Sequence, residues 1–166
     1  MVKSSRHSKI IGLLGEYLVS DSLSKSNFEV ALVDHTGLDI IAYDKTRKKR
    51  LGISVKSRTR EDGTENEAVD VFKHGKEKDD RQLLTDACEY FNCEPWVAVY
   101  SENKDGADLY LVSLGTFDKY HGGKVKEQWK MSEKMRKKYL EDQEVKHLNF
   151  KLNSSRWQFP TPATAQ

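Results

Sequence analysis

The chain has 166 residues, of which 37% are hydrophobic and 33% are charged, and its formal net charge is +2. This length fits one domain with a hydrophobic core, and the composition is typical of a soluble globular protein. No stretch approaches the roughly 18 uninterrupted apolar residues of a membrane-spanning helix, and the N-terminus lacks the apolar region of a signal peptide, so we expect a cytoplasmic protein.

Charge is distributed unevenly along the chain. Residues 45–60 carry eight Lys or Arg and no acid, and residues 61–70 carry five acids and no base. This pattern is typical of a phosphate-facing patch beside a metal-attracting loop, and equally of a solvated hairpin followed by a polar loop. If the chain binds DNA, we expect phosphate contacts from Lys48, Lys49, Arg50, Arg58 and Arg60.

The cysteines and histidines do not form a metal-binding motif. Cys88 and Cys93 lie close together in a segment of helical pattern, without the further ligands that a structural zinc site needs. We therefore predict two reduced thiols. No ligand spacing relates the histidines, which are His7, His35, His74, His121 and His147.

The first predicted element is a helix over residues 6–25. One apolar stripe runs along it at helical spacing, and we expect this stripe to pack on the core. Gly12 and Gly15 weaken a helix by about 1 kcal/mol each, which indicates close packing at these positions. The residues of the stripe are Ile10, Leu13, Leu14, Tyr17 and Leu18.

Three strands are predicted next, as a meander. The segment 28–34, FEVALVD, is apolar almost throughout, as in a strand buried on both faces, and strands over 38–44 and 51–57 follow it. We predict one α/β domain over residues 1–157 and a disordered tail over 158–166. The remaining predicted elements are a loop over 59–75 in which AVDVF can form a short strand, a helix over 76–92 with Leu83, Leu84, Ala87 and Phe91 inward, strands over 96–101 and 108–114, a helix near 133–142 and a strand over 147–152.

Two isolated charges occupy positions in strands that are otherwise apolar. Side chains alternate between the two faces of a strand, so Ser54 and Lys56 share one face of the third strand. If the second and third strands pair with their apolar sets together, Asp39 lies beside Ser54 and Lys56 on the opposite face. An anion and a cation at one end of a sheet form a candidate hydrolytic centre.

This arrangement suits metal-assisted cleavage of a phosphodiester. A carboxylate such as Asp39 can bind Mg²⁺ or Mn²⁺, and the backbone carbonyl of Val55 on the neighbouring strand can supply a second hard oxygen ligand. The ion activates water and stabilises charge on the phosphate. Lys56 can orient that water or neutralise the phosphate.

These residues resemble the PD-(D/E)XK nuclease superfamily. Glu16 in the first helix, GLDIIA at 37–42 and ISVKSR at 53–58 match its order and spacing, in particular those of its archaeal Holliday junction resolvase-like and restriction-endonuclease-like branch. The resemblance covers about residues 10–101. It implies a central mixed sheet flanked by helices, a metal-dependent site, and catalytic roles for Glu16, Asp39 and Lys56.

One position departs from the pattern of that superfamily. Two residues before the lysine the superfamily usually has Glu or Asp, sometimes Gln, and this chain has Ser54. A hydroxyl is a poorer metal ligand than a carboxylate and brings no charge. Another acid would have to compensate; besides Glu16 the candidates are Glu77 and Asp80 near the second helix and, more weakly, Glu65 and Glu67 in the acidic loop.

The sequence therefore predicts a metal-dependent endonuclease-like protein that acts on DNA. Its site would contain Glu16, Asp39, Ser54 and Lys56, and Holliday junction cleavage would need two such sites and hence a homodimer. A non-catalytic member of the same fold that binds nucleic acid or a protein remains open. So does a protein-interaction domain that does not bind nucleic acid.

Overall fold

A computed structural model of the chain describes residues 6–74, 79–121 and 127–151. The candidate acid Glu77 and the predicted tail over 158–166 lie outside these ranges. No helix in the described ranges has the length and apolarity needed to cross a membrane.

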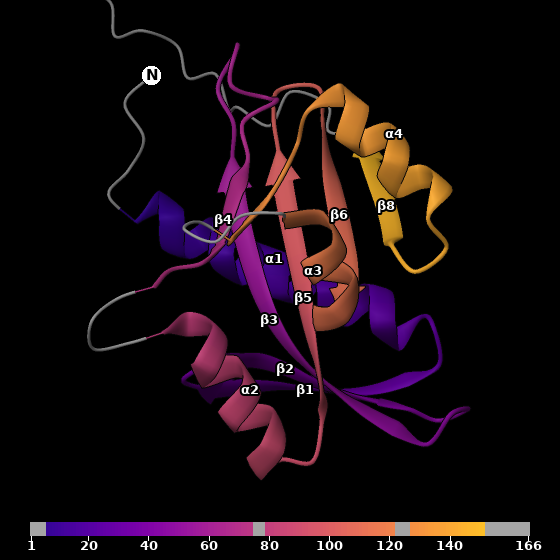
Figure 1. Cartoon of the computed structure of the whole chain (residues 1–166). Helices are drawn as coiled ribbons and strands as arrows, with labels where there is room; N and C mark the ends of the chain where they lie inside the picture. The colour runs from indigo at the N-terminus through magenta and orange to yellow at the C-terminus, as the bar shows by residue number, and fades with distance from the viewer. Residues whose placement is uncertain (1–5, 75–78, 122–126, 152–166) are drawn as a thin grey trace, which may run out of the picture.

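The described residues form four helices and eight strands (Figure 1). In chain order these are α1 (His7–Ser24), β1 (Phe28–His35), β2 (Leu38–Asp44), β3 (Lys49–Thr59), β4 (Val69–Phe72), α2 (Asp80–Tyr90), β5 (Glu94–Glu102), β6 (Gly106–Ser113), α3 (Leu114–His121), β7 (Glu127–Trp129), α4 (Glu133–Glu141) and β8 (Lys146–Lys151).

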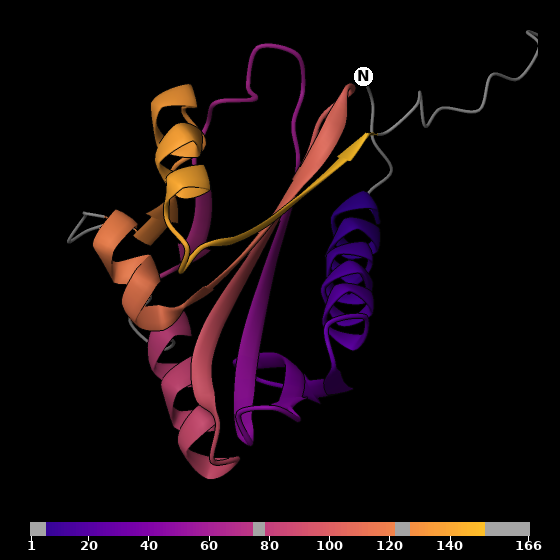
Figure 2. The same cartoon turned by 90° about the vertical axis from the view of Figure 1, so that its right-hand side faces the viewer.

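A mixed sheet forms the centre of the described fold. Its six strands have the order β1-β2-β3-β5-β6-β8, and β3 and β5 are its parallel pair. A second sheet pairs β4 with β7. Helix α1 lies on one face of the central sheet, and α2, α3 and α4 lie on the other (Figure 2). The predicted α/β fold, a central mixed sheet flanked by helices, is confirmed.

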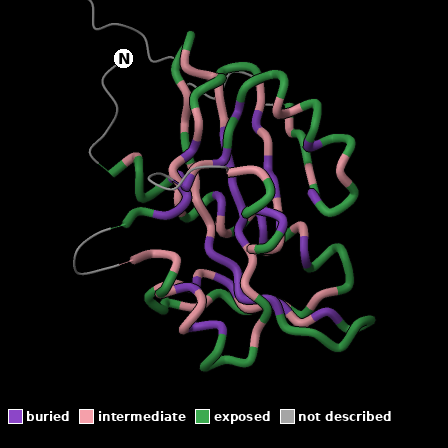
Figure 3. Tube along the Cα trace, viewed as in Figure 1, coloured by how far each residue is buried: buried purple, intermediate pink, exposed green. Residues whose placement is uncertain are grey.

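Central strand β5 shows why the sheet separates two hydrophobic cores. Val97 and Val99 belong to the cluster under α2 and α3, whereas Ala98 and Tyr100 belong to the cluster under α1. Successive side chains of a strand point to opposite faces, so an uninterrupted apolar segment fits a strand covered on both sides. Buried residues accordingly gather along the inner strands in Figure 3.

The predicted meander of β1, β2 and β3 is present, but the expectation that β1 is buried on both faces is wrong. This strand is an edge of the sheet and pairs only with β2. None of its eight residues is fully buried. Its apolar composition therefore reflects a half-covered edge, since Phe28 and Val30 pack toward the α1 side and Val33 toward the α2 side.

Helix α1 forms where the spacing predicts it, but the packed face is not the predicted stripe. The buried residues are Ile11, Gly15, Val19 and Leu23, spaced four apart on one side of the helix. Of the predicted stripe, Leu18 packs against the core beneath α1, whereas Ile10, Leu13, Leu14 and Tyr17 are exposed. Both sides of the helix are apolar, so hydrophobic spacing could not decide which one faces the sheet.

Of the two helix glycines, one explains the close approach of α1 to the sheet. A Cβ atom at Gly15 would lie 2.1 Å from Ser57 Oγ and 3.4 Å from Tyr100 Cβ. The backbone of α1 therefore rests on β3 and β5 at this point. A Cβ at Gly12 would meet nothing within 4 Å, so close packing was wrongly expected there.

The pattern at α2 was predicted only in part. Leu84, Ala87 and Cys88 are buried, whereas Phe91, expected inward, is 42% exposed because it follows the end of the helix. Two short elements, α3 and β7, were not predicted. The three residues of β7 form a strand by pairing with β4, which lies more than fifty residues earlier in the chain.

Glycine 37 joins β1 to β2 next to α2, and we predict that Gly37→Ala is strongly destabilising. Its φ is +97°, and a Cβ would lie 2.4 Å from the carbonyl oxygen of Leu83. Gly63, with φ of +85° and open space around it, is the matched control. Both substitutions impose backbone strain, but overpacking should make Gly37→Ala costlier by roughly 1–3 kcal/mol in urea unfolding. Equal losses would contradict this account.

Candidate active site

The candidate site lies where β2 and β3 separate. Their backbone pairing runs from Asp44 opposite Lys49 to Ile40 opposite Ile53. Beyond that pair, the N–H of Val55 donates to the side chain of Asp39, with 2.6 Å between N and Oδ2. A carboxylate thus takes the hydrogen bond that the next backbone carbonyl of β2 would otherwise accept.

The backbone of Val55 also presents an oxygen to this opening. The N–H and C=O of one strand residue point to the same side of the strand, so the Val55 carbonyl faces β2, as its N–H does. On its other edge, β3 stays paired with β5 as far as Thr59 opposite Glu102. The strand that carries Val55 is therefore held firmly while one side of it is open.

Asp39 is largely buried, and its surroundings have opposite effects on the pKa of its carboxyl group. Burial raises the pKa of its carboxyl group, while hydrogen bonds from the Val55 N–H and Ser54 and the positive charge of Lys56 act in the opposite direction. Burial prevails, so the pKa of Asp39 is raised. The three predicted residues Asp39, Ser54 and Lys56 thus lie together, as the alternation of side chains requires.

Glu16 reaches the same region from α1. Its neighbour Gly15 rests on β3, so the helix backbone approaches the sheet immediately before Glu16. Partial burial raises the pKa of the Glu16 carboxyl group, and the negative charges of Asp39 and Asp34 raise it further. These repulsions place Glu16 within electrostatic reach of both aspartates.

Asp34 is a member of this cluster that the sequence analysis missed. Leu32 pairs with Ile40 and His35 with Leu38, so two residues of β1, Val33 and Asp34, lie opposite the single residue Asp39. This is a β-bulge, an irregularity that redirects side chains and is common beside active sites. No pattern in the sequence marks the bulge; the acidic residue just before the turn at 35–37 was its only visible sign.

The structure therefore brings together the four predicted residues Glu16, Asp39, Ser54 and Lys56 and adds Asp34. In the described ranges, none of the three carboxylates lies within ion-pair distance of a basic side chain. The positive charge of Lys56 attracts Asp39 and offsets part of this charge. The arrangement leaves a local excess of negative charge.

The predicted phosphate contacts divide into two groups. Lys48 ends the turn before β3, and Lys49 and Arg50 begin that strand, about 20 Å along it from Lys56. Lys49 pairs with Glu94 at 2.5 Å. Arg58 is exposed, two residues beyond Lys56 on the same face. Arg60 is mostly buried and its guanidinium binds the carbonyls of residues 67 and 68, so it holds the acidic loop.

The acids proposed to compensate for Ser54 have other contacts. Glu67 pairs with Arg60 at 3.5 Å, and Glu65 accepts the N–H of Gly63 at 3.1 Å. Asp80 accepts the N–H of Lys73 at 3.3 Å near the start of α2. None of them is among the charges that shift the pKa of Asp39 or Glu16.

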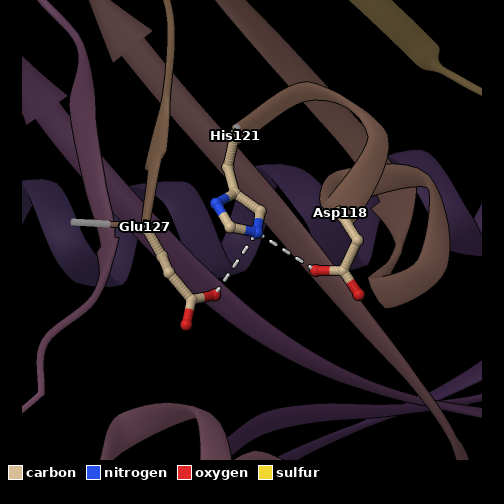
Figure 4. Close-up of side chains that lie close together, drawn as sticks. All are labelled: Asp118, His121 and Glu127. Atoms are coloured by element: carbon tan, nitrogen blue, oxygen red, sulfur yellow. Dashed lines mark ion pairs between the residues drawn. The ribbon is translucent and has the colours of Figure 1, made fainter. Parts of the chain in front are cut away.

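A second acidic cluster lies between α3 and β7, on the face of the sheet that α2, α3 and α4 cover. Asp118 and His121 on α3 and Glu127 on β7 converge, with their ligand atoms within 4.8 Å of one another (Figure 4). His121 Nε2 lies 3.4 Å from Asp118 Oδ1 and 4.0 Å from Glu127 Oε2. The i,i+3 spacing of Asp118 and His121 was the only signal for it in the sequence.

Basic side chains already neutralise this second cluster. Arg81 makes two hydrogen bonds to Asp118, at 2.6 and 2.7 Å, and a further one to the buried Glu127. His74 Nε2 lies 2.9 Å from the other oxygen of Glu127. We interpret these contacts as an ion-pair network that joins α2, α3 and β7, because the guanidinium occupies the position where a cation would be attracted.

The two cysteines and two of the aromatic side chains singled out by type lie in the following surroundings. Cys88 is buried and Cys93 half-buried, and both are free thiols. Burial raises the pKa of Cys88 to about 12, which leaves this thiol protonated and unreactive at neutral pH. His35 packs edge-on against Phe91, with 5.3 Å between ring centroids. Trp129 is fully buried, as expected of a core residue.

Comparison with solved structures identifies a partial likeness in backbone structure. No protein-family model matches the chain, and no curated protein matches it. Hjc, a Holliday junction resolvase from the archaeal hyperthermophile Archaeoglobus fulgidus, is similar with 19% identity and a TM-score of 0.43. The match covers 59% of this chain and 70% of that one. A likeness at this level does not extend to active-site chemistry.

The raised pKa of Glu16 predicts that Glu16→Gln stabilises the protein at neutral pH. A carboxyl group whose pKa is raised on folding destabilises the folded state increasingly as pH rises from its unfolded pKa, near 4.5, through its folded pKa. The variant should therefore equal the wild type near pH 4 and exceed it at pH 7 by less than about 1 kcal/mol, since solvent screens this partly exposed group.

Urea unfolding at the two pH values, in EDTA, measures this difference. Glu133→Gln is the control, because Glu133 is an exposed helix acid, on α4, that pairs with Lys137. A Glu16→Gln variant that is less stable than the wild type at pH 7 would show that Glu16 makes a stabilising contact instead.

Proposed function

We propose that this chain is a metal-dependent endonuclease that hydrolyses phosphodiester bonds of DNA. The observation that carries the proposal is the convergence of Glu16, Asp39 and Lys56, from three separate elements, at the opening between β2 and β3. The resemblance of GLDIIA and ISVKSR to PD-(D/E)XK nucleases supports it. Comparable chemistry at the Asp118 cluster is disfavoured by Arg81.

The donors at this opening fit Mg²⁺ or Mn²⁺. Carboxylate and carbonyl oxygens are the hard ligands that these ions take, and the excess of negative charge favours a cation. The hydrogen bond from the Val55 N–H to Oδ2 holds the Asp39 carboxylate in the opening, where it can bind an ion. Glu16 and the Val55 carbonyl would complete the set. A bound ion supplies a Lewis acid that activates water and offsets charge on the phosphate.

Asp34 would supply the carboxylate that Ser54 does not. Its charge acts on Glu16 together with that of Asp39, and the bulge in β1 places it opposite Asp39. Ser54 is 4% exposed and its hydroxyl stabilises charged Asp39. Ser54 would therefore orient Asp39, and the further acid of the site would come from the edge strand β1.

Lys56 and Arg58 would face the substrate. The ammonium group of Lys56 lies near Asp39, where it can orient water or neutralise a phosphate oxygen. Arg58 is exposed on the same face of β3 and can contact an adjacent phosphate. Contacts of this type fix a nucleic acid in place without reading its sequence.

A second candidate function is nucleic-acid binding without catalysis. The observation that favours it is Ser54 itself, because a site without the usual acid on β3 binds a metal ion less strongly. This alternative predicts salt-dependent DNA binding with no cleavage and no divalent-ion binding.

We expect cleavage of DNA that depends on Mg²⁺ or Mn²⁺ and is abolished by Asp39→Ala and by Lys56→Ala. Loss of a metal ligand or of the lysine should lower the rate by at least about a hundredfold. The assay uses labelled linear duplex, single-stranded and four-way-junction DNA, with RNA for comparison. Lys104→Ala removes a lysine that is exposed and pairs with Asp62, and it is the control. Cleavage that survives both site substitutions would contradict the proposal.

Metal affinity can be tested separately from cleavage. Asp34→Asn should weaken Mn²⁺ binding by at least about tenfold, and Ser54→Asp should strengthen it by a similar factor while lowering stability in EDTA. Isothermal titration calorimetry measures both, with Glu133→Gln as the control. If the wild type binds no ion, the binding-only function is favoured; if it binds and Asp34→Asn has no effect, Asp34 is not a ligand.

A further inference from the structure

Helix α1 has an apolar side that nothing in the described structure covers. Ile10, Leu13, Leu14 and Tyr17 are 58%, 43%, 39% and 60% exposed. Their i, i+3, i+4, i+7 spacing places them on a single stripe, opposite the packed residues Ile11, Gly15, Val19 and Leu23. A helix of a globular protein normally carries polar residues there, and a contiguous exposed apolar surface usually marks an interaction site.

The surroundings of the stripe leave room for a partner. Among the described helices, α1 is on one face of the sheet, while α2, α3 and α4 lie on the opposite face (Figure 2). Leu32, 45% exposed on the neighbouring strand β1, adds apolar surface on the same side of the sheet, since its pair Ile40 packs in the cluster under α1.

Charged residues continue the stripe at both ends. Arg6, the N-cap residue, lies one turn before Ile10, and Asp21 lies one turn after Tyr17. The series from Arg6 to Asp21, here named the outer stripe, is therefore basic, then apolar, then acidic. Its members are Arg6, Ile10, Leu13, Leu14, Tyr17 and Asp21.

This order is complementary to itself. If two copies of α1 lie antiparallel about a twofold axis between Leu13 and Leu14, then Ile10 faces Tyr17 of the second copy. The same geometry places Arg6 opposite Asp21 of the second copy, so unlike charges meet at both ends. A twofold contact needs this property, because the same surface serves both partners. Antiparallel helix dipoles also attract one another.

We propose that the outer stripe of α1 is the contact surface for a second copy of this chain, which pairs with it as an antiparallel helix pair. The exposed pair of Asp21 with Lys25, at 2.6 Å, does not prevent this, since such pairs contribute little and exchange readily. Because Glu16 is on the same helix, the dimer holds two candidate sites at a fixed spacing. Dimerisation itself requires neither metal nor DNA, so it stands apart from the proposed function.

Sedimentation velocity of the full chain in EDTA, from about 1 to 200 μM, tests the proposal, because a stripe of this size predicts a reversible dimer within that range. Leu13→Glu should weaken dimerisation by at least about tenfold. Leu140→Glu is the matched control, since Leu140 is 65% exposed on α4, on the other face. Circular dichroism verifies that both variants fold.

Charge exchange tests the antiparallel orientation. Asp21→Arg should weaken the dimer, and the double variant Arg6→Glu/Asp21→Arg should restore it, because opposite charges again meet across the axis. A wild type that stays monomeric overturns the proposal. So does a dimer that Leu13→Glu does not weaken, or one that Leu140→Glu weakens as much as Leu13→Glu does. A double variant no tighter than Asp21→Arg alone overturns the antiparallel pairing.

Discussion

The hydrogen bond from the Val55 N–H to the carboxylate of Asp39 determines how the candidate site is built. It ends the pairing of β2 with β3 without leaving a backbone donor unsatisfied, and it holds the carboxylate in the opening that results. The cost of an unpaired buried N–H makes such a replacement necessary wherever a sheet opens. The same contact positions Asp39 beside Ser54 and Lys56.

Two acidic clusters, one at the opening between β2 and β3 and one between α3 and β7, show how similar residues serve different purposes. Glu127 and Asp118 meet Arg81 at close range, and the network joins elements of two sheets and two helices. Among the described residues, no arginine pairs with Glu16 or Asp39 in this way, and the pKa of each carboxyl group is raised. A fold gains nothing from uncompensated carboxylates, so their presence indicates a site that binds a cation or another ligand.

Helix α1 connects the candidate site with the outer stripe. Its packed side fits the sheet closely at Gly15, which carries Glu16 toward Asp39, and its opposite side is apolar and exposed. Two apolar sides on one helix are expected of an element covered on both sides by protein. A partner on the outer stripe would therefore complete a layer that the single chain leaves open, and would keep Glu16 near the boundary between two copies.

The sequence by itself determined the helix, the meander and the central strands, because their periodicity is a local property of neighbouring residues. It also determined that Asp39, Ser54 and Lys56 share one face, since strand alternation fixes that relation once the register is chosen. Only the tertiary structure decided which side of α1 packs, because both sides are apolar and the choice depends on the fit of Gly15 against Ser57 and Tyr100. The tertiary structure also decided that Asp34 joins the site, since a β-bulge depends on pairing between strands. It decided as well that Arg81 neutralises the Asp118 cluster, since these residues lie far apart in the sequence.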